Sequence, residues 1–282
     1  MGKKLHTASG RRFILLSLVM WCVTILFLAP FYVLIIYAFK PREATMLKNP
    51  LAFPDTLYLQ NFVEAVQKSD FLRAFTNSTV STVCGVVVLV LICSMAAYIV
   101  VRRGNNRFYG VWQYIFLASV MLPFQTIMFP LYKNLMNLHL LNSRPAYVLV
   151  SVGFQMGFDI FLYCGFIKTV PVELEEAACI DGCNIYKIFI QIILPLMKPS
   201  LATIAIFTFL QSWNELMFAV VFISKPAYRT LTVGIQSLVG QYTTDWGPIG
   251  AGLVVATFPI IIIYVILSRQ VQQSLIAGSV KG

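Results

Sequence analysis

The stretch Pro171–Pro199, PVELEEAACIDGCNIYKIFIQIILPLMKP, interrupts a chain that is otherwise built from long apolar runs. Three carboxylates, Glu173, Glu175 and Glu176, follow Pro171 closely. Proline suits the first position of a helix, where its missing N–H costs no hydrogen bond. Acidic side chains in the first turn are favoured by the helix dipole. The sequence therefore predicts a helix that begins at Pro171 and has an acidic first turn.

The second half of this stretch predicts a turn and another short helix. Gly182 can adopt the left-handed conformation that commonly ends a helix. A second helix is expected from about Ile185 to Ile193. Leu194-Pro195 should end it, because a proline disfavours the helical conformation of the residue before it. The whole stretch is predicted to be a helix-turn-helix at a membrane surface, with an acidic first half available to a soluble partner.

The composition indicates a membrane protein with several spans. Of 282 residues, 59% are hydrophobic and 11% are charged, which is outside the range of soluble globular domains. Several runs are long and apolar enough to cross a bilayer. We predict an all-α polytopic membrane protein with six transmembrane helices in contact with lipid. The expected spans are Phe13–Phe39, Ser78–Val101, Val111–Tyr132, Ala146–Ile167, Ser200–Ile223 and Ile249–Leu267.

The basic residues predict how the chain is oriented in the membrane. The net charge of +10 could indicate nucleic-acid binding in a soluble protein, but here the Lys and Arg residues lie mostly in tails and loops. Short loops rich in Lys and Arg face the cytoplasm. The basic N-terminal tail, the link after the second span and the Pro171–Pro199 stretch therefore all fall on the cytoplasmic side, with both termini. The N-terminal apolar run is too long for a cleaved signal peptide and is expected to remain as an anchor.

The sequence shows no motif of a catalytic centre. It has no GxxxxGK[ST] phosphate loop, no HExxH, no GxSxG and no CxxC, and only two histidines, His6 and His139. We therefore expect a chain that is not an enzyme, binds no metal or cofactor, and cannot hydrolyse ATP by itself.

Five polar residues inside predicted spans are candidates for a translocation path. Gln155 and Asp159 are four residues apart on the fourth span, and so are Gln211 and Glu215 on the fifth, with Asn214 beside them. A charged side chain facing lipid at a helix centre would cost about 2.5–3.5 kcal/mol, so these residues should face protein or water. Two explanations remain open: a hydrophilic solute pathway, or hydrogen bonds between helices that stabilise the bundle.

The Pro171–Pro199 stretch resembles the EAA loop of bacterial ABC-importer permeases. Glu176-Ala177-Ala178 is followed after three residues by Gly182, then after nine residues by Ile192, and then by Leu194-Pro195. Trp213-Asn214 is similar to a pair that sugar-type permeases carry in their fifth span. The chain resembles the carbohydrate branch of this family, in particular the smaller permease subunit of maltose importers.

The resemblance implies an importer of the bacterial inner membrane. A second permease subunit would complete the channel, two ATP-binding-cassette ATPase subunits would hydrolyse ATP, and an extracytoplasmic binding protein would deliver the solute. Residues 1–282 would form one transmembrane domain with a coupling loop at about residues 168–199. In the family this loop lies in a cleft of the ATPase, and the loop resembling Ser224–Pro248 contacts the binding protein. The residues assigned to ATPase coupling are Glu173, Glu176, Ala177, Ala178, Asp181, Gly182, Leu194 and Pro195.

The sequence leaves other transport functions open. One alternative is an ABC permease for another solute, such as a peptide or a phosphodiester. A secondary transporter without an ATPase is a second, although it should show internal inverted repeats, and none is visible. A polytopic membrane enzyme is the third. The sequence does not identify the sugar, the ATPase, or whether the solute contacts this subunit directly.

Overall fold

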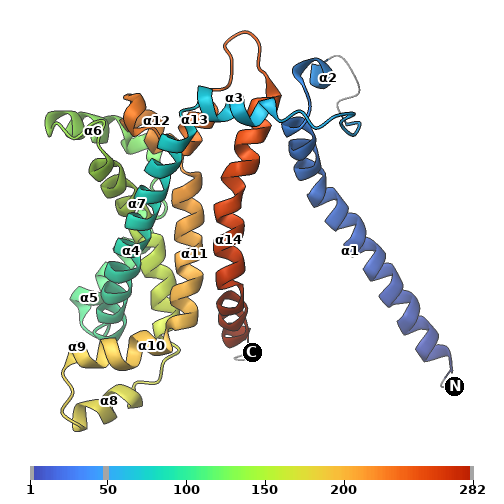
Figure 1. Cartoon of the computed structure of the whole chain (residues 1–282). Coiled ribbons are helices and arrows are strands. Elements are labelled where there is room, and N and C mark those ends of the chain that lie inside the picture. The colour runs from blue at the N-terminus through green and yellow to red at the C-terminus, as the bar shows by residue number, and fades with distance from the viewer. Residues whose placement is uncertain (1–2, 47–50, 280–282) are drawn as a thin grey trace. The chain divides into compact units, whose positions relative to one another are not determined.

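The computed structural model describes residues 3–46 and 51–279, and every regular element in these two ranges is a helix (Figure 1). Within them, four helices are long and apolar enough to cross a membrane, and two bent pairs could each form one further span. The long helices are α1 (Lys3–Ala38), α4 (Phe71–Arg102), α7 (Arg144–Ile167) and α14 (Trp246–Ser279). The described part of the chain thus has between four and six candidate spans, in keeping with the expected fold class.

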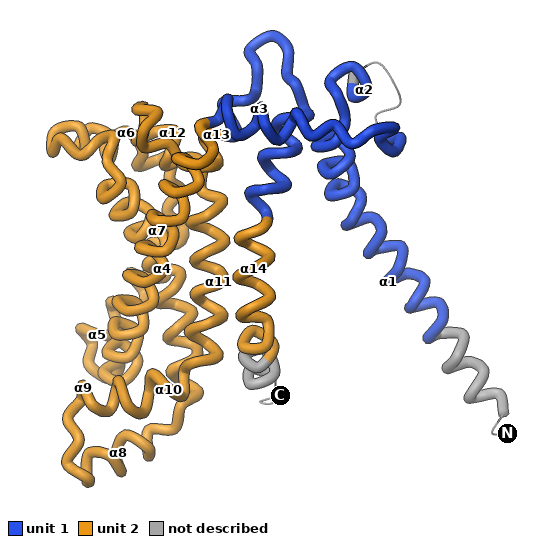
Figure 2. Tube along the Cα trace, viewed as in Figure 1, with its two compact units in different colours: residues 1–69, 235–257 blue, residues 70–234, 258–282 orange. Residues whose placement is uncertain are grey.

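Two compact units make up the chain (Figure 2). Unit 1 comprises residues 1–69 and 235–257, and unit 2 comprises residues 70–234 and 258–282. Both units contain part of α14, and their boundary also falls inside α13 (Leu231–Gln236). The larger unit 2 holds the candidate functional residues.

Unit 1 is organised around close backbone packing. It contains α1, α2 (Arg42–Met46) and α3 (Gln60–Lys68). A Cβ at Gly250 would lie 3.1 Å from the backbone of α1, so glycine permits this contact. Large apolar side chains are exposed along most of α1, whose apolar window is only 6% buried. Such a helix is suited to contact with lipid rather than water.

The third predicted span is not one helix. The expectation of a continuous helix over Val111–Tyr132 was wrong: α5 (Arg107–Ser119) and α6 (Phe124–Asn137) meet at an angle of 100°. Pro123 lies at the break with an extended backbone (φ −70°, ψ 134°). Proline has no N–H for the helical ladder and disfavours helix at the residue before it, which explains why α5 does not continue into α6.

The fifth predicted span is also interrupted. The sequence predicts a helix over Ser200–Ile223, but α11 (Lys198–Asn214) ends at Glu215, whose backbone is extended (φ −67°, ψ 124°). A separate helix, α12 (Met217–Phe222), follows. The side chain of Glu215 accepts hydrogen bonds from the backbone N–H of Phe218 at 3.0 Å. This side-chain cap competes with continuation of α11, so the expected single helix was wrong.

The stretch that interrupts the apolar runs forms the expected helix and turn. Its first helix, α8, spans Glu173–Ile180, with all three glutamates in the first turn. Gly182 ends it with φ +80°, as predicted for a left-handed glycine. The start was predicted two residues too early, because α8 begins at Glu173 rather than at Pro171.

The expected end at Leu194-Pro195 was wrong. After α9 (Ile185–Ile188) comes a π-helical turn, Phe189–Ile193, and then α10 (Leu194–Leu196), in which Leu194 keeps helical dihedrals (φ −60°, ψ −43°). In an α-helix the ring of Pro195 would meet the carbonyl of Gln191, four residues earlier. Gln191 lies in the wider π-helical turn, which accommodates the ring and lets the helix continue. The continuous segment then meets α11 at an angle of 77°.

The core of unit 2 lies where α4, α7 and α11 pack together. Its fully buried residues include Leu89 and Cys93 of α4, Ile160 and Tyr163 of α7, and Ile204 of α11. These three helices form the scaffold that positions both candidate sites described below.

Candidate translocation cavity and coupling helix

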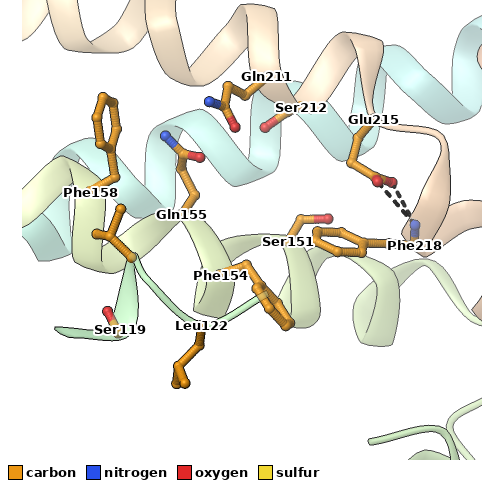
Figure 3. Close-up of a pocket in the computed structure, with 11 residues that line it drawn as sticks. Ser119, Leu122, Ser151, Phe154, Gln155, Phe158, Gln211, Ser212, Glu215 and Phe218 are labelled. Carbon is orange, nitrogen blue, oxygen red and sulfur yellow. Dashed lines mark hydrogen bonds between the residues drawn. The ribbon is translucent and has the colours of Figure 1, made fainter. Parts of the chain in front are cut away.

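A cavity of about 470 Å³ opens in unit 2 between α7, α11 and the break that follows α5 (Figure 3). This volume is within the range of small-molecule sites. About half of its lining residues are polar and three carry aromatic rings. The lining consists of Ser119, Val120, Leu122, Ser151, Phe154, Gln155, Phe158, Gln211, Ser212, Glu215 and Phe218.

The close packing of α5 against α7 positions one wall of this cavity. A Cβ at Gly157 of α7 would lie 2.7 Å from the carbonyl oxygen of Phe116 and closer still to the hydroxyl of Ser119. Only glycine allows this approach, because the carbonyl is backbone and cannot rotate away. The approach places Ser119 and Leu122, at the end of α5, against α7.

Three of the five predicted path residues line the cavity. The side chains of Gln155 and Gln211 point toward each other from α7 and α11, and Glu215 lies further along α11 (Figure 3). The other two do not line it. Asn214 is exposed, and its side-chain amide donates to the carbonyl of Leu210 at 2.9 Å.

Asp159 is fully buried between α7 and α11. One carboxylate oxygen accepts a hydrogen bond from Gln155 Nε2 at 3.0 Å, and the other lies 2.9 Å from the hydroxyl of Thr208 on α11. Asp159 therefore joins the two helices and holds the amide of Gln155, which does reach the cavity. This geometry agrees with the helix-stabilising explanation for Asp159, whereas Gln155, Gln211 and Glu215 line the cavity, with Gln211 exposed, Glu215 half-buried and Gln155 buried.

Glu215 is fixed in the cavity wall. Both carboxylate oxygens lie 3.0 Å from the backbone nitrogen of Phe218, and the backbone carbonyl of Glu215 accepts a hydrogen bond from Thr232 at 2.8 Å. Among the described residues, the ones that line the cavity include no Lys or Arg. Its hydroxyl, amide and carboxylate groups can exchange hydrogen bonds with a solute, while the phenylalanine rings provide apolar surface.

The second candidate site is the surface of α8. Glu173, Glu176 and Ala177 are exposed, as expected for residues that meet a partner. Ile180 on the same helix is 87% exposed. Ala178, by contrast, is buried against the core of unit 2, so its small side chain permits packing within this chain. Of the remaining predicted residues, Asp181, Gly182 and Pro195 are exposed and Leu194 is half-buried.

Sequence reasoning missed the role of Glu175. This glutamate is 8% exposed and turns inward, unlike its neighbours on α8. Its carboxylate lies 2.6 Å from Arg102 Nε and accepts a hydrogen bond from the hydroxyl of Tyr98 at 2.7 Å, both on α4. The only available signal was the three-residue spacing from Ala178, which places both residues on one helix face.

The family of the chain follows from its sequence profile. The profile of the family described as binding-protein-dependent transport system inner membrane component matches residues 89–276. The chain belongs to this family. It is thus a transport component of the inner membrane, which agrees with the apolar helices described above.

Relatives of this chain include permease proteins that are named for sugar substrates. The chain is 33% identical over 259 residues to the probable starch degradation products transport system permease protein AmyC of Thermoanaerobacterium thermosulfurigenes, covering 92% of this chain and 93% of that protein. It is 30% identical to the melibiose/raffinose/stachyose import permease protein MelC of Bacillus subtilis, covering 98% of this chain and 99% of that protein.

Solved structures show the same fold. A chain in the crystal structure of a bacterial ABC transporter involved in the import of the acidic polysaccharide alginate matches with a TM-score of 0.78 at 21% identity, covering 95% of this chain and 98% of that one. A second match, with a TM-score of 0.70 at 15% identity, comes from the alginate transporter in complex with an alginate pentasaccharide-bound periplasmic protein. At these identities the likeness establishes the fold of this family.

Proposed function

We propose that this chain is a permease subunit of an ATP-driven, binding-protein-dependent importer for a sugar or oligosaccharide. The substrates for which its relatives are named, which include starch degradation products and melibiose, support this substrate class. A second permease subunit would complete the channel, two ATPase subunits would hydrolyse ATP, and an extracytoplasmic binding protein would deliver the sugar. The chain itself would bind no cofactor and would lie in the bacterial inner membrane with both termini in the cytoplasm.

The observation that carries the proposal is the exposed surface of α8. This helix lies outside the candidate spans, yet Ile180 at its end is 87% exposed. Glu173 and Glu176, seven and four residues before Ile180, lie on the same face of α8 and are exposed. Exposed apolar side chains that cluster with charges mark a protein interface. We assign this surface to the ATPase, with the carboxylates available to its basic side chains and Ala177 permitting close approach.

The cavity is the part of this chain that would face the solute. Gln155, Gln211 and Glu215 would line this subunit's share of the path, and Asp159 would orient Gln155 from behind. Asn214 would join the path only after a local rearrangement, since it now points to the backbone of its own helix. Sugars carry many hydroxyl groups on apolar rings, which suits a wall of amides, hydroxyls and phenylalanines.

The proposed cycle is alternating access. Closure of the two ATPases on ATP would move α8, and α8 would move the spans that surround the cavity. A rigid lever of this kind is one of the known ways to convert a local event into a domain motion.

A mild-detergent pull-down of the tagged chain tests the proposal. We expect recovery of a second permease and an ATPase, with ATP hydrolysis that is stimulated by a sugar-loaded binding protein. Ile180→Asp should abolish ATPase recovery, because it places a charge in the apolar surface of α8. Tyr242→Asp is the matched control, since Tyr242 is 92% exposed but lies in the segment after α13. Recovery of the wild-type chain alone, or only as a homo-oligomer, would favour a secondary transporter instead.

A further inference from the structure

Helix α4 is held at its N-terminal end by the segment that follows α12. The side-chain amide of Asn77 donates to the carbonyls of Ala227 and Arg229 at 3.0 and 2.9 Å. The hydroxyl of Ser78 accepts a hydrogen bond from the backbone N–H of Leu231 at 2.8 Å. Asn77 and Ser78 are 1% and 3% exposed, so water does not compete for these bonds. This segment belongs to the loop that the family resemblance assigns to the binding protein.

The C-terminal end of α4 is held by the coupling helix. Tyr98 and Arg102 both contact the carboxylate of Glu175 on α8, and Arg102 also donates to the carbonyl of Val170 at 2.9 Å. The side chains of Arg102 and Glu175 are only 15% and 11% exposed. A hydrogen-bonded ion pair with so little exposure is screened by water and salt much less than a surface pair.

The part of α4 between these two contacts is continuous. From Asn77 to Tyr98 an α-helix rises by about 31 Å, which is close to the thickness of the hydrocarbon core of a bilayer. The segment has no proline and no break, whereas the α5–α6 and α10–α11 pairs are bent by 100° and 77°. Along this length α4 packs against α7 and α11. Figure 1 shows α4 running from the region of α13 to the region of α8 and α9.

We infer that α4 is a rigid connection that transmits docking of the binding protein, at the segment after α12, to the ATPase-facing helix α8. Asn77 and Ser78 make its contacts at one end. Tyr98, Arg102 and Glu175 make them at the other. The inference rests on the proposed function. Glu175 is thus a positioning residue that acts on α8 from inside the chain, distinct from Glu173 and Glu176 on its exposed surface.

The connection through α4 adds to the covalent one through α7. Residues 168–172 join α7 to α8 without helical structure, so the chain alone leaves the direction of α8 free to change. The contact of Glu175 with α4 restricts that direction, together with the packing of Ala178 against the core of unit 2. Loss of the Glu175 contact should still allow α8 to bind the ATPase, but α8 should then follow the motion of the spans less closely.

The test uses the complete importer in lipid nanodiscs, with hydrolysis measured both without binding protein and with sugar-loaded binding protein. Glu175→Gln, Arg102→Gln and Asn77→Ala should retain assembly and basal hydrolysis. Stimulation by the loaded binding protein should fall by roughly tenfold or more for Glu175→Gln, since a charge-assisted bond is lost. Arg103→Gln is the charge-matched control and Thr76→Ala the control for Asn77. Arg103 is exposed, and Thr76 bonds only within its own helix.

The double variant Asn77→Ala/Glu175→Gln decides whether the two ends act in series. If both contacts act through one connection, the double variant should retain as much stimulation as the less stimulated of the two single variants. If they act independently, the two fold-losses should multiply. Three outcomes would each overturn the inference. They are normal stimulation in the single variants, multiplied losses in the double variant, and loss of the ATPase from the variant complexes. Absence of an ATPase from the wild-type complex would instead refute the proposed function. Tyr98→Phe, which keeps the ion pair, provides a milder variant if Glu175→Gln folds poorly.

Discussion

Replacing Gly157 by alanine should separate α5 from α7. The added Cβ would lie 2.7 Å from the carbonyl oxygen of Phe116 and still closer to Ser119 Oγ. The serine can rotate, but the backbone carbonyl can move only with the helix. Overpacking of this kind costs about 1–3 kcal/mol. Alanine in a helix otherwise gains about 1 kcal/mol over glycine, so the clash must outweigh this gain.

Gly153, one turn earlier on α7, is the matched control. A Cβ there meets no atom within 4 Å, so Gly153→Ala should raise stability by about 1 kcal/mol. Because the gain from alanine applies to both variants, they should differ by the clash alone, about 1–3 kcal/mol, or on the order of 5 °C in Tm. Thermal unfolding of each purified variant in the same detergent measures this difference.

A Gly157→Ala variant that unfolds at or above the temperature of Gly153→Ala would refute the close approach of α5 and α7. The same result would weaken the description of the cavity, because this approach places Ser119 and Leu122 in its wall. If the approach is correct, Gly157→Ala should also reduce sugar uptake per folded molecule.

Four further substitutions test the two sites. Asp159→Ala should lower the free energy of unfolding by about 1–2 kcal/mol, because hydrogen bonds between α7 and α11 are lost. The protein level in the membrane should fall as well. Unchanged thermal stability would contradict the bridging geometry of Asp159. Glu215→Gln keeps an acceptor for the α12 cap, so uptake should change while stability shifts by less than about 1 kcal/mol; a fall in membrane protein that matches the fall in uptake would point to a structural role. Glu176→Lys and Gly182→Asp should each abolish uptake at normal membrane levels, measured by radiolabelled sugar transport and immunoblot, and normal uptake would argue against docking through α8.

The apolar runs predicted where the helices lie, but not where they break. Pro123 and Pro130 both fall in the third predicted span, and the sequence treats both as tolerated prolines. Pro130 is accommodated within α6, whereas Pro123 separates α5 from α6. The local sequence does not distinguish the two prolines, since each lacks an N–H for the helical ladder. The same holds at Glu215, whose cap on α12 requires the chain to leave the α11 axis.

The candidate sites divide in the same way. Gly182 could be predicted because a left-handed backbone position has one preferred residue. Helix spacing groups Gln155 with Asp159 and Gln211 with Glu215, and the structure places Gln155 and Gln211 in the wall of one cavity. The buried position of Glu175 could not be predicted, because its partners Tyr98 and Arg102 lie more than seventy residues earlier in the chain. Charge and spacing alone do not distinguish the buried Glu175 from the exposed Glu173 and Glu176.

The π-helical turn at Phe189–Ile193 contains roughly one residue more than an α-helical turn. Because the extra residue is absorbed within that one turn, α9 and α10 keep nearly the orientation that an uninterrupted helix would give them. Deleting one residue from the turn would restore α-helical spacing and bring the ring of Pro195 against the carbonyl four residues earlier. Deleting one residue from a regular α-helical part would instead rotate everything beyond it by about 100°. The first deletion therefore strains the helix at Pro195, whereas the second changes the direction that the exposed surface of α8 faces.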